Sequence, residues 1–332
     1  MIDGITILIS TFNGKPNLST TLEGLARLVR NSIPHLELIL VDNASTDDTA
    51  NFVQAKWNEL GNPFHLNIIY EPRAGKINAQ NTGLKAVKTE YVLICDDDNE
   101  LMPDYLENGY KLLKSNPKIG ALGGRGIVKS TVEIPIWFES MAYMYACAPQ
   151  AKKTGDVRPE RNVIYGAGMF VNMKAYQKAI NAGFKVLLPS RIGKSVVTGA
   201  EDGELCWWLR FAGYEIWYSE NLVFNHHIQP SRLTEEYRIK LLTMFKIGFP
   251  VGKLYLRIFS GELRRPIRFF WFKEVCYTLK DLVKLFFNRG QEKKLELKRS
   301  FAQMIYFLKV RGEYDKTYHD LLHKYNQLNL GK

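Results

Sequence analysis

Short apolar runs alternate with longer segments of helical period over the first 125 residues of the chain. The apolar runs are rich in β-branched residues and predict strands at residues 4–9, 37–41, 66–70, 91–95 and 119–122. Between the first two strands, leucine and valine recur at helical spacing from Leu18 to Val29. Because strands and helices alternate, the pattern predicts right-handed crossovers and an α/β fold, with a doubly wound, mainly parallel sheet and helices on both faces.

Beyond Gly126 the periodicity weakens. A helix is still predicted at residues 205–211, where apolar positions share one face, and a strand at residues 215–218 that extends to Phe224. Paired glycines at residues 166–168 precede another apolar run, which is typical of a close approach of the backbone to a ligand or a neighbouring strand.

Polar clusters follow three of the predicted strands. They occupy residues 10–13 (STFN), 42–47 (DNASTD) and 96–100 (DDDNE). In open α/β sheets ligands bind beyond the carboxyl ends of the strands, so we expect these clusters to line one binding edge. The alternative is that such residues form turns and helix caps, which is their commonest use and the favoured interpretation for Asp47 and Asp48.

The run Asp96, Asp97 and Asp98 places three carboxylates side by side, where they repel one another unless a cation lies among them. A hard divalent cation, Mg²⁺ or Mn²⁺, typically takes one or two carboxylates plus substrate phosphate oxygens. We therefore favour a metal site here over the alternative, a solvated acidic turn of the kind that is common on protein surfaces.

The composition of the 332-residue chain, 46% hydrophobic and 24% charged, is close to that of an average soluble globular protein. It argues against disordered, collagen-like and disulfide-stabilised proteins. The four cysteines form no CxxC pair, so neither a zinc site nor a disulfide framework is indicated, and a reducing cytosol is expected. We expect no secretory signal and no membrane-spanning helix, because the N-terminal pattern and the apolar run lengths do not fit either.

The net charge of +11 is unevenly divided along the chain. Residues 231–332 contain 22 Lys and Arg against 10 Asp and Glu, whereas residues 1–230 contain 23 against 24. We therefore expect a nearly neutral domain at 1–230 and a basic, mostly helical segment at 231–332 that meets an anionic partner.

Within the basic segment, apolar residues recur at helical spacing over residues 275–286, while Lys273, Lys280 and Lys284 lie mostly off that stripe. Residues 264–272 add arginines beside aromatic side chains. Such helices bind anionic membrane surfaces, so peripheral membrane contact is expected. The alternatives are helices that pack on the first domain and expose their lysines, and a nucleic-acid surface, which is disfavoured because no nucleic-acid-binding module is recognisable.

In their order and spacing, these motifs resemble those of the family-two inverting glycosyltransferases, which have the GT-A fold. The resemblance covers about residues 4–230 and includes the three polar clusters. It also includes GKINAQNTGL at 75–84, GAGM at 166–169, and Glu201-Asp202 before a helix that ends in AGY at 212–214. Two positions depart from the family pattern: Gln80 stands where Arg is frequent, and Ser10 stands where Pro is common.

The resemblance implies a nucleotide-diphosphate sugar as donor, lying across the carboxyl edge of the sheet. The residues implied to bind this donor are Thr11, Asn13, Asp42, Ser45, Lys76, Asn81, Asp96 and Asp97. For Lys76, a solvated surface lysine is the alternative. The resemblance further implies a metal held by Asp98, with Asp96 and with His226 or His227 completing the shell. We favour His226, and an imidazole ligand would favour Mn²⁺ over Mg²⁺.

The resemblance also implies Asp202 as the catalytic base, with Glu201 orienting it or the acceptor. A base is needed because an acceptor hydroxyl is a poor nucleophile until its proton is taken. The residues expected on the acceptor side are Gly166, Gly168, Met169 and Trp207. A basic loop beside the acceptor or diphosphate is expected at residues 191–195 (RIGKS), which lack the earlier glycine of a phosphate-binding loop.

The resulting prediction is a metal-dependent inverting glycosyltransferase on the cytoplasmic face of the membrane. Its acceptor would be a saccharide or a polyprenyl- or other lipid-linked molecule, in the assembly of a surface polysaccharide or glycolipid. One alternative is a nucleotidyltransferase of similar fold, which would release pyrophosphate instead of a nucleoside diphosphate. The other is a non-catalytic sugar-nucleotide-binding or membrane-binding protein, which would bind without turnover.

Overall fold

The computed structural model describes residues 1–158, 161–187, 201–260, 270–287 and 293–329. The first of two compact units comprises Met1–Val186 and Glu201–Thr234, and the second contains the residues from Glu235 onward. The basic loop expected at residues 191–195 and most of the 264–272 segment lie outside the described residues.

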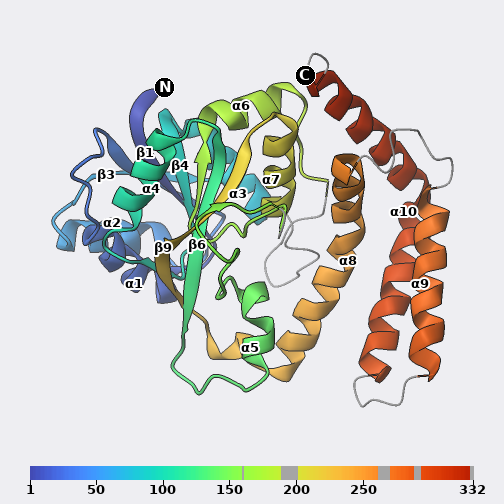
Figure 1. The fold of residues 1–332 in the computed structure, drawn as a ribbon. Helices are drawn as coiled ribbons and strands as arrows, with labels where there is room; N and C mark the ends of the chain where they lie inside the picture. Colours follow the sequence, from blue (N-terminus) through green and yellow to red (C-terminus); the bar gives the residue numbers. More distant parts are fainter. Residues whose placement is uncertain (159–160, 188–200, 261–269, 288–292, 330–332) are drawn as a thin grey trace. The chain divides into compact units, whose positions relative to one another are not determined.

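One mixed sheet runs through the first unit, as Figure 1 shows. Its described strands are β1 (Ile2–Thr11), β2 (Leu36–Asp42), β3 (His65–Tyr70), β4 (Thr89–Cys95), β5 (Asn99–Leu101), β6 (Ile119–Lys129), β7 (Gly155–Asp156), β8 (Met169–Asn172) and β9 (Glu215–His227). Their order is β3-β2-β1-β4-β8-β6-β9-β5, with β7 paired to β9. The strands predicted from the apolar runs are all present, and the predicted fold class is confirmed.

The direction of each strand follows from the segment that connects it to the preceding strand. β1 runs parallel to β2 and β4, and β2 runs parallel to β3, because helical crossovers join them. β8 instead runs antiparallel to both of its neighbours, β4 and β6. The chain enters β8 from a long connection after β6 with only short helical turns, so the rule that makes crossover strands parallel does not apply there.

Alternating side chains on β1 contribute to two apolar cores, one on each face of the sheet. Ile5, Ile7 and Ile9 pack in one core with residues of α1 (Lys15–Ala26), α2 (Thr49–Glu59) and α4 (Tyr105–Ser115). Leu8 packs in the other with residues of α3 (Lys76–Ala86), α6 (Met173–Asn181) and α7 (Glu201–Phe211). The short helices are α5 (Phe138–Met141), η1 (Ala142–Tyr145) and η2 (Pro230–Arg232). The sheet is therefore covered on both sides, and its carboxyl edge is left to loops.

The second unit is helical. It consists of α8 (Glu235–Ser260), α9 (Phe270–Phe287) and α10 (Lys293–Asn329). An ion pair of 3.1 Å joins Lys246 Nζ on α8 to Glu296 Oε2 on α10, and the backbone N–H of Trp271 donates to Asp315 Oδ1 at 3.0 Å. None of the helices in the described part of the chain is long and apolar enough to cross a membrane.

Candidate active site at the carboxyl edge of the sheet

The loops that follow β1 and β2 are tied together by side-chain hydrogen bonds. The N–H of Asn13 donates to Ser45 Oγ at 2.9 Å, and Asn13 Oδ1 accepts from the N–H of Thr46 at 2.8 Å. Asp42 Oδ1 accepts from the N–H of Ser45 at 3.0 Å. Asn13 has a φ of 53°, a left-handed conformation that Asn tolerates better than most residues. The structure thus brings Asn13, Asp42 and Ser45 together.

A residue outside the predicted site set, Asn43, fixes the loop before α3. Its side-chain amide donates to the carbonyl of Arg73 at 2.7 Å, and its Oδ1 accepts from the N–H of Gly75 at 2.8 Å. In the same loop the Arg73 guanidinium pairs with both oxygens of Glu71, at 2.9 and 3.0 Å. These hydrogen bonds lower the pKa of Glu71 to about 2. The only sequence signal for Asn43 was its place in the polar cluster after β2.

Lys76 begins α3 and points its ammonium group at the aspartate run. Its Nζ lies 2.9 Å from Asp96 Oδ1. Burial raises the pKa of Asp96, but the charge of Lys76 outweighs it, so that this pKa lies below its ordinary value. α3 lies close to β1 because Gly83 has no side chain: a Cβ there would lie 2.2 Å from Leu8 Cδ1. Asn81, on the same helix, is exposed and is not brought to the aspartates by any described contact.

Asp97 is held by Thr11, whose hydroxyl donates to Asp97 Oδ2. Burial and the neighbouring charge of Asp98 raise the pKa of Asp97 to about 7. A carboxyl group with such a pKa is protonated in a large part of the molecules at neutral pH. The Asp97 carboxyl therefore holds a proton more readily than an isolated aspartate does.

Asp98 lies between two cationic side chains. Its Oδ1 is 3.2 Å from His226 Nε2, and its Oδ2 is 3.0 Å from the Arg232 guanidinium. His226 Nδ1 donates to the carbonyl of Tyr145 at 2.7 Å. Burial alone lowers the pKa of His226, but the charge of Asp98 and the hydrogen bond to it raise this pKa to about 10. Burial likewise raises the pKa of Asp98, but these partners hold it well below its usual range.

The two adjacent histidines on β9 point to different partners, as neighbours on a strand must. His226 is 4% exposed and meets Asp98. The His227 imidazole is 37% exposed, and its Nε2 lies 3.0 Å from Glu100 Oε2. Of the two imidazoles, only that of His226 lies beside the aspartate run, whereas His227 contacts the run through its backbone N–H, which donates to the Asp98 carbonyl at 2.9 Å.

The described side chains around Asp98 offer fewer ligands than a divalent cation requires. Among the described residues, no group of three or more His, Cys, Asp or Glu side chains is arranged to hold a metal ion. Asp98 and His226, however, are buried neighbours, and Mg²⁺ or Mn²⁺ often takes only one or two protein ligands when phosphate oxygens supply the rest. Once His226 has released its proton, the pair fits a cation shared with a substrate diphosphate, and it does not fit an all-protein cage.

Asp202, in the first turn of α7, is held from the loop before β8. The N–H of Gly166 donates to Asp202 Oδ2 at 3.0 Å. A Cβ on Gly166 would lie 2.3 Å from Asp202 Cγ, so glycine is required for this approach. Glu201 is buried at 5% exposure, and the ring of Trp207 lies 3.9 Å from the Cβ position of Gly203. Glu201 and Trp207 thus belong to the same helix turns as Asp202.

The structure places the two remaining residues predicted on the acceptor side, Gly168 and Met169, in different surroundings. Gly168 has a φ of 69°, and its carbonyl accepts from the Tyr105 hydroxyl at 2.6 Å. Met169, one residue on, is fully buried and packs with the core beneath α3, α6 and α7. Its side chain is therefore not brought to the site: alternation along β8 turns it into the core.

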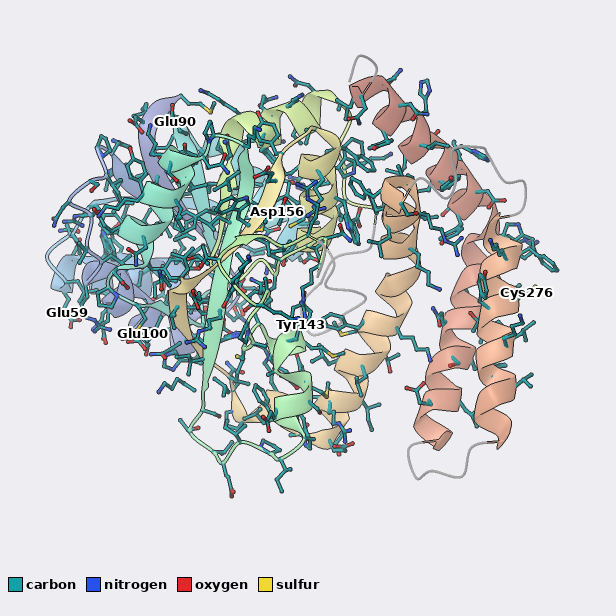
Figure 2. All side chains as sticks on the ribbon, viewed as in Figure 1. Glu59, Glu90, Glu100, Tyr143, Asp156 and Cys276 are labelled. Atoms are coloured by element: carbon teal, nitrogen blue, oxygen red, sulfur yellow. The ribbon has the colours of Figure 1, made fainter. Side chains whose placement is uncertain are left out.

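An aromatic group that sequence reasoning missed lies near Asp202. The ring of Tyr165, the residue before Gly166, is 5.8 Å from that of Tyr143, which Figure 2 labels. The Arg161 guanidinium carbon lies 3.3 Å from the centroid of the Tyr143 ring. Burial raises the pKa of Tyr143, and the charge of Asp202 contributes in the same direction. No sequence signal marked these residues, because the periodicity of this stretch is weak.

Residues 6–184, more than half of the chain, match the sequence model of glycosyl transferase family 2. The chain belongs to this family. The resemblance inferred from the motifs is therefore confirmed, and the protein is a family 2 glycosyltransferase.

Two curated relatives of this family 2 glycosyltransferase are poly-β-1,6-N-acetyl-D-glucosamine synthases. The Staphylococcus aureus (strain COL) protein is 26% identical over 220 residues, which cover 65% of this chain and 48% of the relative. The Staphylococcus epidermidis (strain RP62A) protein is 28% identical over 133 residues, covering 40% of this chain and 31% of the relative. The chain thus matches less than half of the length of either relative.

Solved structures share the fold of this family 2 glycosyltransferase. S. aureus TarS 1–349 in complex with UDP-GlcNAc is similar with a TM-score of 0.53 and 14% identity, covering 98% of this chain and 90% of that one. The mannosyltransferase PcManGT from Pyrobaculum calidifontis, in complex with GDP-Man and Mn²⁺, is similar with a TM-score of 0.51 and 18% identity, covering 100% of this chain and 82% of that one. At these identities the likeness shows the GT-A-like fold alone.

Proposed function

We propose that this family 2 glycosyltransferase is a metal-dependent inverting enzyme that moves a sugar from a nucleotide-diphosphate donor to an acceptor hydroxyl. The observation that carries the proposal is the Asp98–His226 pair within the aspartate run at the carboxyl edge. With the proton of the His226 imidazole released, it offers a cation two buried ligands and leaves other coordination positions for a diphosphate. On the acceptor side, Asp202 is held by the Gly166 N–H.

On the donor side, Asn13, Asp42 and Ser45 form one hydrogen-bonded loop pair, and Thr11 binds Asp97. We assign the nucleotide to this edge, with Lys76 toward the phosphates. The fold neighbours TarS and PcManGT hold UDP-GlcNAc and GDP-Man, which supports a nucleotide sugar as the ligand class. Asn81 is exposed on α3, and its assignment to the donor has the least structural support of this set.

The cation that fits is held by Asp98 and His226, and the imidazole favours Mn²⁺ over Mg²⁺. When bound, it supplies Lewis-acid stabilisation of the diphosphate as the sugar leaves. Asp96 stays paired with Lys76, and Arg232 keeps Asp98 ionised. Lys76 and Arg232 orient the diphosphate and balance its charge.

On the acceptor side, Asp202 takes the proton of the attacking hydroxyl, with Glu201 supporting its position. We assign Tyr143 and Tyr165, whose rings lie 5.8 Å apart beside Asp202, to the acceptor. That acceptor is a saccharide or a polyprenyl- or other lipid-linked molecule at the cytoplasmic face of the membrane. Assembly of a surface polysaccharide is supported by the relatedness to poly-β-1,6-N-acetyl-D-glucosamine synthases.

The test is a comparison of Asp202→Asn with wild type in two assays, donor binding and nucleoside diphosphate release with Mn²⁺ present. The variant is expected to lose transfer by at least about 10²-fold, as for removal of a general base, while donor affinity stays unchanged. Equal loss of binding and transfer would show that Asp202 is structural. Release of pyrophosphate by wild type would instead indicate nucleotidyl transfer, and binding without turnover a non-catalytic protein.

A further inference from the structure

Helix α9 carries two apolar stripes, and only one of them is packed. The buried stripe includes Val275 at 8% and Thr278 at 5% exposure. The other consists of Phe272 at 56%, Leu279 at 45% and Val283 at 58% exposure, with Cys276, also exposed, between them. These four positions have helical spacing and cover about 16 Å of helix length. The single stripe predicted over residues 275–286 is thus divided between a packed and an exposed face.

Positive charge borders the exposed stripe. Lys273 and Lys280 are exposed and each follows a stripe residue by one position, which places both about 100° around the helix. The ammonium groups of Lys253 and Lys273 each lie 5.9 Å from the centroid of the Tyr277 ring. An apolar stripe edged by lysines is the pattern of a helix that lies in a membrane interface.

Helix α10 repeats the pattern. Phe301 is 53% exposed, Ile305 39% and Leu308 42%, again at helical spacing, and the next residue, Lys309, is also exposed. The whole segment from Ser231 to Lys332 carries 22 basic against 10 acidic residues. Exposed apolar and basic residues therefore occur together on both helices.

We propose that the exposed stripe of α9 (Phe272, Cys276, Leu279 and Val283) and its flanking lysines dock the protein on an anionic lipid surface. The apolar side chains enter the boundary between headgroups and acyl chains, and Lys273 and Lys280 contact lipid phosphates. A second copy of this chain is the less suitable occupant, because pairing two such stripes brings like-charged lysines together, whereas an anionic surface neutralises them. The inference rests on the proposed membrane contact and not on glycosyl transfer, so either can fail without the other.

The first test measures co-sedimentation of the full chain with vesicles of phosphatidylcholine alone or mixed with phosphatidylglycerol. We expect binding to the mixed vesicles that weakens as salt is raised. Lys273→Gln with Lys280→Gln should weaken it by about fivefold per lysine, or roughly 30-fold together. The matched control is Lys118→Gln with Lys153→Gln, which removes the same charge from exposed lysines of the first unit. Equal loss in both pairs, or no binding at low salt, would overturn the proposal.

A second pair tests the apolar contact. Leu279→Ser with Val283→Ser should weaken binding at least about tenfold, because buried apolar area is lost from the interface. Val132→Ser with Ile136→Ser changes two exposed apolar residues of the first unit, at 44% and 100% exposure, and should leave binding unchanged. Equal weakening by both pairs would place the docking surface elsewhere.

Cys276 supplies a reporter inside the stripe (Figure 2). It is exposed, whereas Cys95 and Cys206 are buried and Cys147 is half-buried, so a nitroxide reagent should attach mainly at Cys276 of a Cys147→Ser variant. On mixed vesicles the label should become accessible to oxygen and shielded from a water-soluble nickel chelate. A label that stays accessible to the chelate on vesicle-bound protein would overturn the assignment. A dimer mass measured in solution without vesicles would also overturn it, if the Leu279→Ser with Val283→Ser variant were monomeric. The stripe would then be an interface between two copies of the chain.

Discussion

Gly166→Ala tests whether the position of the Asp202 carboxylate limits the reaction. A methyl group at residue 166 would lie 2.3 Å from Asp202 Cγ and Oδ2, whereas ordinary contacts begin at 3.4 Å. The carboxylate must therefore move by about 1 Å, and a misplacement of that size can cost 10²-fold in rate. The 3.0 Å hydrogen bond from the Gly166 N–H is strained or lost at the same time. We expect kcat to fall roughly 10²-fold.

The assay is steady-state release of nucleoside diphosphate, together with the donor dissociation constant from calorimetry. Because Gly166 contacts Asp202 and none of the donor-side residues by any described hydrogen bond, donor affinity should change less than about twofold. The control is Gly203→Ala, which adds the same methyl group next to Asp202. There the new Cβ would lie 3.8 Å from Val163 and 3.9 Å from the Trp207 ring, so the carboxylate can stay in place.

Two outcomes would refute this reasoning. One is a Gly166→Ala enzyme with wild-type kcat, which would mean that the carboxylate need not hold this position. The other is an equal loss of kcat in Gly166→Ala and Gly203→Ala, which would point to crowding around α7 in general. The melting temperature of each variant shows whether a loss of activity comes from unfolding. This control is needed because a lost hydrogen bond to a charged group costs about 1.5–3 kcal/mol of stability.

Two further predictions concern the histidines and the loop before α3. His226→Ala should lower activity and raise the Mn²⁺ concentration needed for half-maximal rate by at least about tenfold, because a metal ligand or its support is lost. His227→Ala should change neither quantity. Equal effects of the two substitutions would contradict the assignment. Glu71→Gln should lower the melting temperature at pH 7, because the folded-state pKa of Glu71 is lowered from 4.5 to about 2 by Arg73. That contribution is present above the unfolded pKa and is lost as pH falls toward 2, so the gap between wild type and Glu71→Gln should close from pH 5 to pH 2. A gap that is independent of pH would assign the effect to packing.

The central part of the fold followed from periodicity alone. Buried strands such as β1 and β4 are nearly continuous apolar runs because both of their faces are covered, and the helices between them repeat at helical spacing. The rule that ligands bind beyond the carboxyl ends of strands then placed Thr11 and Asp97 at one edge, where they share a hydrogen bond. Periodicity was sufficient there because parallel strands bring their carboxyl ends to one edge of the sheet.

Other features depended on contacts that one sequence does not encode. The direction of β8 and the stacking of Arg161 on Tyr143 arise in a stretch whose periodicity is weak. Met169 was expected on the acceptor side from the resemblance at residues 166–169, yet strand alternation sends its side chain to the core. The same alternation could have separated His226 from His227, since His226 is two residues from the buried Phe224 and shares its face.

The aspartate run shows most clearly why the charge balance of a site escapes sequence reasoning. From the sequence, the three adjacent carboxylates favoured a metal site over a solvated acidic turn. In the fold, Lys76 arrives from α3, His226 from β9 and Arg232 from η2, separated from the run by 20 to 134 positions. These side chains already balance much of the charge. A cation at Asp98 and His226 must therefore compete with Arg232 for one carboxylate, and it gains the advantage when a diphosphate adds negative charge. Donor and metal are then expected to bind cooperatively, each raising the affinity for the other by the same factor.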